Sequence, residues 1–164
     1  SYLNASGQLL KSPGAFFDNF RDAGAGAGTA VRFLAMAGLL HTAAGLMVAR
    51  PVQPLVFAAI TFANAMGIVL FSGIVGYIVM GMFLGRKIPF PRLFSVYAFA
   101  SGTTLLFSWI PFFLWLTEPW KWWLVYTGLT KGCGFPKKEG LLMVLLSVCV
   151  MLTFFYSLMA ILQP

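Results

Sequence analysis

Charge is scarce in this chain of 164 residues, of which only 9% are charged, whereas soluble domains carry about 25%. The sequence also holds one histidine and two well-separated cysteines, too few for a structural zinc site or a disulfide framework. Only four residues are acidic: Asp18, Asp22, Glu118 and Glu139. These shortages argue against a soluble enzyme, a nucleic-acid-binding module and a disulfide-rich secreted scaffold, and we expect no metal site.

What the chain has instead is apolar length. Apolar residues make up 60% of it, about 98 residues, and the mean hydropathy is +0.88. One membrane-spanning helix needs about 20 such residues, so the composition supplies roughly five spans. We therefore predict an all-α integral membrane protein with five transmembrane helices, over residues 31–49, 54–85, 93–111, 112–130 and 141–162. The second stretch is long enough to be either one tilted helix or a span followed by a bend near residues 73–76.

Residues 1–30 precede the first span and carry a different pattern. Ser12 and Pro13 are typical of a helix start, and Phe16, Phe17 and Phe20 then fall on one helix face. Charged residues occupy most of the opposite face. We predict an amphipathic helix over residues 12–23 that lies at the membrane surface, so that a surface segment (1–30) precedes the transmembrane domain (31–164).

The basic residues give an orientation. With five spans, nine of the eleven Lys and Arg residues fall on the side of the N-terminus, and only Arg50 and Lys121 fall on the other side. Because cytoplasmic loops are enriched in Lys and Arg, this bias predicts a cytoplasmic N-terminus and a C-terminus outside. The alternative is a four-span protein in which residues 93–130 form a re-entrant pair.

Two polar residues at membrane depth are candidate functional groups. His41 lies near the middle of the first span and Asn64 near the middle of the second. Ionisable residues inside membranes usually serve a function, so His41 is a candidate haem ligand, proton relay or hydrogen-bond donor to a quinone. The alternative is a structural role, in which both side chains make hydrogen bonds between helices. We expect no cofactor bound by this chain alone, although His41 and Asn64 are candidates to contact a quinone, haem or chlorin ring supplied by a neighbour.

Other residues suit packing and anchoring rather than chemistry. Small residues four positions apart allow two helices to approach closely, within the chain or toward a partner, and the candidates are Gly67, Gly81, Gly85, Ala98 and Gly102. Tryptophans typically anchor helices at the headgroup level, and here these are Trp115, Trp120, Trp122 and Trp123. The sequence shows no catalytic set, because His41 has no acidic partner at its depth in the sequence pattern. We therefore do not expect an enzyme.

The order of these features resembles the Yip1 family, in particular its compact bacterial members. The resemblance covers nearly the whole chain and rests on degenerate motifs. They are Leu10-x-x-Pro13-x-x-Phe16-Phe17, the Gly-rich second span, Phe90 to Tyr97-Ala98-x-x-Ser101, Trp109-Ile110-Pro111, Trp120 to Leu124 with Gly128-Leu129, a short basic loop and an uninterrupted last span.

The resemblance implies five spans with a cytoplasmic N-terminus, and a location in the bacterial cytoplasmic (inner) membrane. Eukaryotic relatives act in vesicle traffic and contact small GTPases through a longer N-terminal region. This chain has only about 30 residues there and lacks the Asp-Leu-Tyr-Gly-Pro signature, so we do not carry the GTPase contact over. We expect a non-catalytic accessory subunit that packs against a larger membrane assembly. The alternative is a self-associating membrane organiser that acts on lipids or membrane traffic without a fixed complex.

Overall fold

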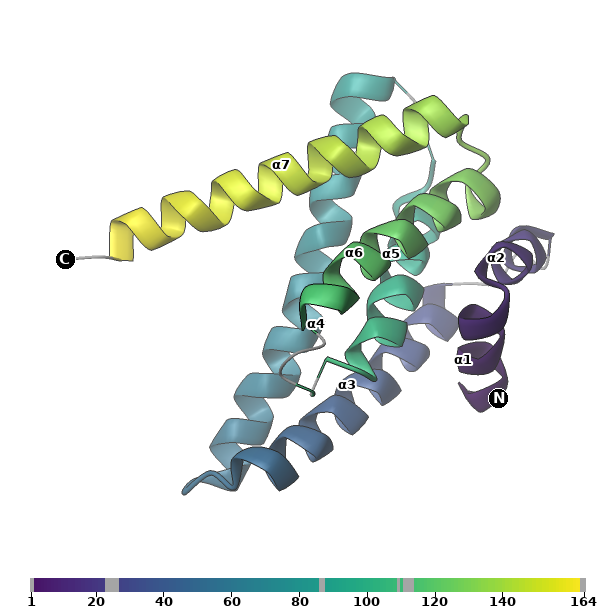
Figure 1. Cartoon of the computed structure of the whole chain (residues 1–164). Coiled ribbons are helices and arrows are strands. Elements are labelled where there is room, and N and C mark those ends of the chain that lie inside the picture. The colour runs from purple at the N-terminus through teal and green to yellow at the C-terminus, as the bar shows by residue number, and fades with distance from the viewer. Residues whose placement is uncertain (1, 23–26, 86–87, 109, 111–113, 163–164) are drawn as a thin grey trace.

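A computed structural model describes residues 2–22, 27–85, 88–108, 110 and 114–162 (Figure 1). The described residues form helices joined by short turns, with no strand among them, which confirms the all-α prediction. The elements are α1 (Tyr2–Lys11), α2 (Pro13–Asp22), α3 (Ala27–Ala49), α4 (Pro54–Val79), the π-helical turn η1 (Met80–Leu84), α5 (Phe90–Leu105), α6 (Leu114–Thr127), the π-helical turn η3 (Gly128–Gly132) and α7 (Lys137–Leu162).

Three helices are long and apolar enough to cross a membrane, judged by length and composition. They are Ala27–Ala49, Pro54–Leu84 and Lys137–Ser157, and they coincide with the first, second and last predicted spans. α5 has 16 residues and α6 has 14. At 1.5 Å per residue α5 measures about 24 Å, which is less than the roughly 30 Å hydrocarbon core. Three of the five predicted spans thus correspond to helices long enough to cross a membrane, and the third and fourth predicted spans correspond to the shorter α5 and α6. The predicted boundary at residues 111 and 112 lies outside the described residues.

The long second stretch is one continuous helix without a bend at its central glycines. α4 continues directly into η1, and the chain then turns at Gly85, which has a φ of 59°. This left-handed conformation favours glycine, because a residue with a Cβ is strained there. Gly85 therefore ends the helix and directs the chain back toward α5.

The core of the protein is α5, whose side chains are all buried from Leu93 to Thr104. α3, α4, α6 and η3 pack around it. The ring of Phe99 lies at its centre, with ring centroids 5.0 to 5.5 Å from those of Phe16, Phe20 and Phe33. Such aromatic contacts add to the stability gained from burying the rings. One short helix thus connects the N-terminal segment with the predicted spans.

Glycines let the neighbouring helices approach α5 and its rings closely. A methyl group on Gly73 of α4 would lie 3.0 Å from the ring of Phe94, and one on Gly102 of α5 would lie 2.8 Å from the ring of Phe33. Gly76 lies in the same way under the ring of Tyr97. The close packing of α4 and α3 against α5 therefore depends on aromatic rings seated on glycines.

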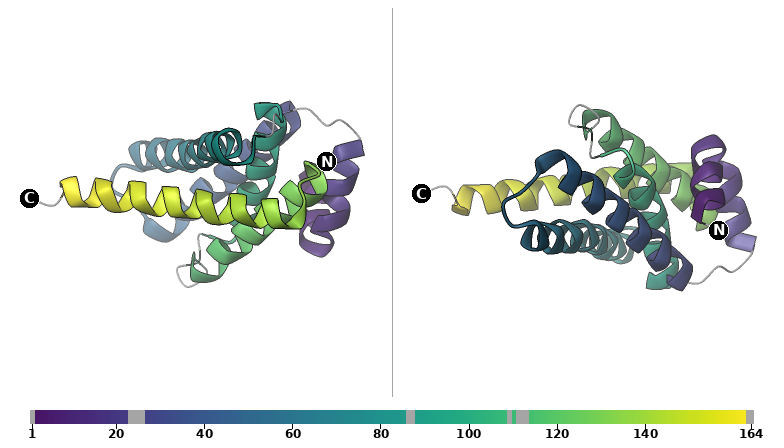
Figure 2. Two further views of the ribbon diagram at one scale, coloured as in Figure 1. Left: turned by 90° about the horizontal axis from the view of Figure 1, so that it is seen from above. Right: turned by 90° about the horizontal axis from the view of Figure 1, so that it is seen from below.

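The N-terminal segment forms two helices, α1 and α2, where the sequence predicted one over residues 12–23. They lie together at one end of the molecule (Figures 1 and 2). Phe17 of α2 is fully buried and Phe20 is 6% exposed. Phe17 packs against Gly128 and Gly132, while Asp18 forms an ion pair of 3.7 Å with Lys131. Much of the apolar face that predicted membrane contact is thus covered by the protein itself.

α7 packs against α4 with one stripe and leaves its other faces open. Met143, Ser147 and Met151 are buried on that stripe, and the ring of Phe154 lies 4.9 Å from that of Phe71 on α4. The opposite faces carry exposed leucines and aromatic residues such as Tyr156, which is 78% exposed. The C-terminal half of α7 projects beyond the other helices (Figures 1 and 2).

The contact between α2 and η3 gives a stability prediction. A methyl group on Gly128 would lie 3.0 Å from the Phe17 ring and overlap Val96. We expect Gly128→Ala to destabilise the protein by about 1–3 kcal/mol, as overpacking of a core does. Gly67→Ala is the matched control, because nothing lies within 4 Å of a methyl group there and alanine is the better helix former. Thermal unfolding in mild detergent measures both, and equal unfolding temperatures would contradict this packing.

Candidate functional site: a polar cavity between four helices

The two polar residues singled out in the first two spans, His41 and Asn64, line one cavity of about 430 Å³. Its walls come from α3, α4, α5 and α6. The other polar residues that line it are Thr61, Ser101, Thr104, Ser108, Thr117, Glu118 and Lys121, and apolar residues such as Ile60, Ile68 and Leu105 complete the lining. A cavity of this size falls in the range of small-molecule sites.

His41 makes a hydrogen bond across the bundle. Its Nδ1 lies 3.1 Å from the hydroxyl oxygen of Ser108, directly after α5. That hydroxyl also lies 3.1 Å from the carbonyl oxygen of Leu105, which can only accept a hydrogen bond. All three groups are satisfied when Nδ1–H donates to Ser108 and Ser108 donates to Leu105, and Nε2 is then the acceptor of the ring. The bond fixes the imidazole at the edge of the cavity.

Glu118 and Lys121 bring opposite charges to the same cavity. The ammonium of Lys121 donates to both carboxylate oxygens of Glu118 at 2.6 Å. The side chain of Lys121 is 14% exposed and that of Glu118 is 56% exposed, so the cation is the more enclosed partner. The ammonium also lies 5.3 Å from the ring centroid of Trp122, a cation–π distance. These contacts hold the ammonium in place on α6.

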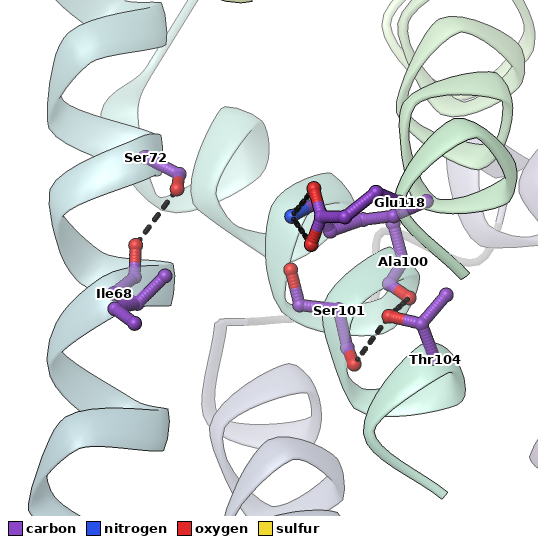
Figure 3. A network of polar contacts seen from close by, with 7 residues as sticks. Ile68, Ser72, Ala100, Ser101, Thr104 and Glu118 are labelled. Carbon is purple, nitrogen blue, oxygen red and sulfur yellow. Dashed lines mark hydrogen bonds and ion pairs between the residues drawn. The ribbon is translucent and has the colours of Figure 1, made fainter. Parts of the chain in front are cut away.

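Hydroxyl groups on the helices around the cavity donate to carbonyl oxygens of their own helix, which allows these polar residues to be buried. Thr104 donates to the carbonyl oxygens of Ser101 and Ala100, at 3.0 and 3.4 Å, and Ser72 on α4 donates to Ile68 in the same manner. Figure 3 shows these bonds together with Glu118, which lines the cavity along with Ser101 and Thr104. Because each hydroxyl donates to a carbonyl oxygen of its own helix, these two side chains can be buried without a partner from another helix.

The small residues include buried and exposed members, and the tryptophans include half-buried and exposed ones. Ala98 and Gly102 are buried in α5, whereas Gly67, Gly81 and Gly85 are exposed with open space around them. Among the tryptophans, Trp115 is 88% and Trp123 51% exposed, while Trp120 packs its ring 5.8 Å from that of Phe107 and Trp122 lies half-buried beside Lys121. Trp109 lies outside the described residues.

The sequence pattern missed the association of Glu118 and Lys121 with His41. The neighbouring tryptophans indicate a membrane boundary, but whether a boundary residue also faces a cavity depends on how α6 packs on α5. The only sequence signal is the spacing of three residues, which places both charges on one helix face. Contact of His41 or Asn64 with a quinone, haem or chlorin ring of a neighbour stays a prediction.

The arrangement suits binding better than catalysis. Ser108 and His41 lie at the distance of a nucleophile and its base, but the Ser108 proton has the Leu105 carbonyl as an alternative acceptor, and the Glu118 carboxylate is paired with Lys121. Among the residues that the structure describes, no group of three or more His, Cys, Asp or Glu residues is placed to hold a metal ion. The cavity therefore offers fixed polar contacts to an occupant.

A family model named Yip1 domain matches residues 7–161. The chain belongs to the Yip1 family. The match extends from α1 to α7 and so includes every helix that lines the cavity. Yip1 proteins are membrane proteins and are not known as enzymes, in agreement with the apolar helices α3, α4 and α7. No curated protein and no solved structure matches the chain.

In this Yip1 protein a second set of contacts lies at the opposite end, around Arg92 at the start of α5. Arg92 donates to the carbonyl oxygen of Gly132 at 2.9 Å and so satisfies the end of η3. Burial raises the pKa of the neighbouring Cys133 thiol from 9.0 to about 11, while the positive charge of Arg92 lowers that pKa in part. The thiol is therefore protonated and unreactive at neutral pH.

This pKa predicts slow and pH-dependent alkylation of Cys133. In a Cys149→Ser background we expect iodoacetamide to react about a hundredfold more slowly at pH 8 than with an ordinary thiol, because only the thiolate attacks. The rate should rise with pH until about pH 11. Arg92→Met should move the profile to higher pH, and Arg92→Lys, which keeps the charge, should move it less. A rate that levels off near pH 9 in the folded protein would contradict the buried position of the thiol.

Proposed function

We propose that this Yip1 protein crosses the membrane five times, with the N-terminus in the cytoplasm, and lies in a bacterial inner membrane. The course of the helices supports this proposal, because α3 and α4 run in opposite directions, as do α5 and α6, before α7 crosses α4 obliquely (Figure 1). The Asp18–Lys131 ion pair and the Arg92–Gly132 bond join α2, η3 and α5 at one end. In the five-span order of the sequence, nine of the eleven basic residues fall on the side of the N-terminus, as expected for a cytoplasmic face.

Within that topology, we propose that the protein acts as a non-catalytic membrane organiser that associates with lipids. The observation that carries the proposal is the polar cavity between α4 and α6. Its residues Asn64 and Glu118 are exposed at the protein surface, so the cavity opens sideways. In a bilayer such an opening gives access to lipid molecules, and polar groups at that depth require a polar partner.

A role as an accessory subunit of a larger membrane assembly is the second candidate. The projecting half of α7 favours it, because Leu152 and Tyr156 are 65% and 78% exposed there. Together with the exposed Gly67 of α4 and Gly81 of η1, these residues offer surfaces on which another membrane helix can pack. The same faces also suit contact with lipid tails or with a second copy of this chain.

The five-span topology is tested by cysteine labelling. We expect an impermeant maleimide to label Val52→Cys and Trp115→Cys from outside intact cells, because the five-span order puts Val52 in the first outer loop and Trp115 at the outer end of the fourth span. Lys138→Cys should react only after the cells are permeabilised. The native cysteines are replaced by serine in all variants, and Val52 and Trp115 are 98% and 88% exposed. Labelling at Val52 but not at Trp115 would indicate instead that α5 and α6 form a re-entrant pair.

Native purification in mild detergent, followed by mass spectrometry, separates the two functional candidates. A membrane organiser should appear alone or as a homo-oligomer that carries lipids. An accessory subunit should appear with other membrane proteins in fixed stoichiometry. As a control, a variant with Leu152→Ser and Tyr156→Ser should lose such partners while keeping lipid, because the lining of the cavity includes no residue of α7. Fixed partners in the wild-type protein would overturn the organiser proposal.

A further inference from the structure

The charges in the cavity are balanced and still have free bonding capacity. The ammonium of Lys121 has three protons, and its two hydrogen bonds to the carboxylate of Glu118 leave one of them. The carboxylate of Glu118 accepts from Lys121 and has further lone pairs. The pair therefore presents a cation and an anion next to each other. Its natural complement is a ligand that carries an anion and a cation at a similar spacing.

In the proposed topology the cavity opens toward the lipid phase. On α4 its rim is formed by Ile60, Asn64 and Ile68, which are exposed, whereas Ser101 and Thr104 on α5 are buried at its floor. α4 belongs to one of the three helices long and apolar enough to span a membrane. A ligand can therefore enter sideways from the bilayer and rest an apolar part against the isoleucines of the rim.

The charged end of the cavity, at Glu118 and Lys121, lies at a depth that suits a lipid headgroup, whereas His41 and Asn64 lie deeper. Glu118 and Lys121 fall in the first two turns of α6, within about 11 Å of its start at 1.5 Å per residue. They are flanked by the tryptophans of the same helix, which are typical of the headgroup region. In the proposed topology this is the outer side of the membrane.

We propose that the cavity binds the phosphoethanolamine headgroup of a membrane phospholipid. Its phosphate contacts the ammonium of Lys121, and its primary ammonium donates hydrogen bonds to Glu118. The acyl chains leave between α4 and α6 across Ile60 and Ile68. The inference rests on the proposed association with lipids, to which it adds the chemical class of the headgroup.

Other headgroups fit the charge pair less well. A headgroup with a net negative charge, as in phosphatidylglycerol, is repelled by Glu118 and has no cation to offer it. A phosphocholine headgroup has the same charges but no N–H group, so it cannot donate a hydrogen bond to the carboxylate. A soluble cation is repelled by the ammonium of Lys121. The combination therefore favours phosphatidylethanolamine over the other two lipids.

Native mass spectrometry of the purified protein with added lipids tests the proposal. We expect phosphatidylethanolamine to bind at least about tenfold more tightly than phosphatidylcholine or phosphatidylglycerol, a difference of about 1.4 kcal/mol, since only its headgroup donates a hydrogen bond to the charged carboxylate. Lys121→Met and Glu118→Gln should each abolish this preference. Lys138→Met, which removes an exposed cation outside the cavity, should leave it unchanged.

A variant in which the two charges are exchanged distinguishes loss of binding from loss of folding. The double variant Glu118→Lys/Lys121→Glu keeps an ion pair three residues apart on α6 but reverses its direction. We expect it to stay folded, with an unchanged unfolding temperature, and to lose the preference for phosphatidylethanolamine. Equal binding of the three lipids by the wild-type protein, or an unchanged preference in the exchanged variant, overturns the proposal.

Two further results separate this inference from the proposed function. Soluble phosphoethanolamine that competes at the same concentration as the lipid would assign the cavity to a free metabolite and overturn the lipid inference. Co-purified lipid of any class without a preference at Glu118 and Lys121 would overturn the headgroup inference while leaving the membrane-organiser proposal standing.

Discussion

The architecture depends on a short helix that is buried on every side. α5 has 16 residues, and the twelve from Leu93 to Thr104 are all buried, so the neighbouring helices must fit closely against most of its length. The fit is achieved by placing rings on glycines: Phe94 lies on Gly73, Tyr97 on Gly76 and Phe33 on Gly102. Because interiors are close-packed, little at these contacts can change without moving α3 or α4.

The same constraint accounts for the position of the cavity. α5 ends at Leu105, whereas α3 and α4 have 23 and 26 residues and extend further. The last turns of α5 therefore form the floor of a space whose walls are α3, α4 and α6. Ser108 continues the chain past the end of α5 and bonds His41. The polar residues of the site gather where the central helix ends.

Much of the fold could be predicted from the sequence because it depends on local patterns. Length and apolar composition alone identify α3, α4 and α7, and the spacing of Phe16, Phe17 and Phe20 predicts α2. His41 and Asn64 could be singled out because each is polar within an apolar stretch. The family resemblance, too, rested on motifs spread over nearly the whole chain.

The remainder depended on contacts between distant segments. Nothing near Phe17 in the sequence indicates that its partner is Gly128. The amphipathic pattern therefore predicts a helix at the membrane surface, whereas in the structure protein covers much of its apolar face. Likewise, Glu118 and Lys121 join His41 only because α6 packs beside α5. The serines and threonines of α5 make its sequence less apolar than that of a typical core helix. In the structure, hydroxyls such as that of Thr103 donate to carbonyl oxygens of the same helix, here that of Phe99, so the helix can still be buried.

The docking of α2 onto η3 has a consequence for biosynthesis. Phe17 leaves the ribosome 111 residues before Gly128, and at about 5–20 residues per second this interval lasts about 6–22 s. During that time the apolar face of α2 lacks its final partner, and the bilayer surface can remove this face from water. During synthesis α2 thus lies first on the bilayer surface, and it leaves that surface to pack against η3 once η3 has been made.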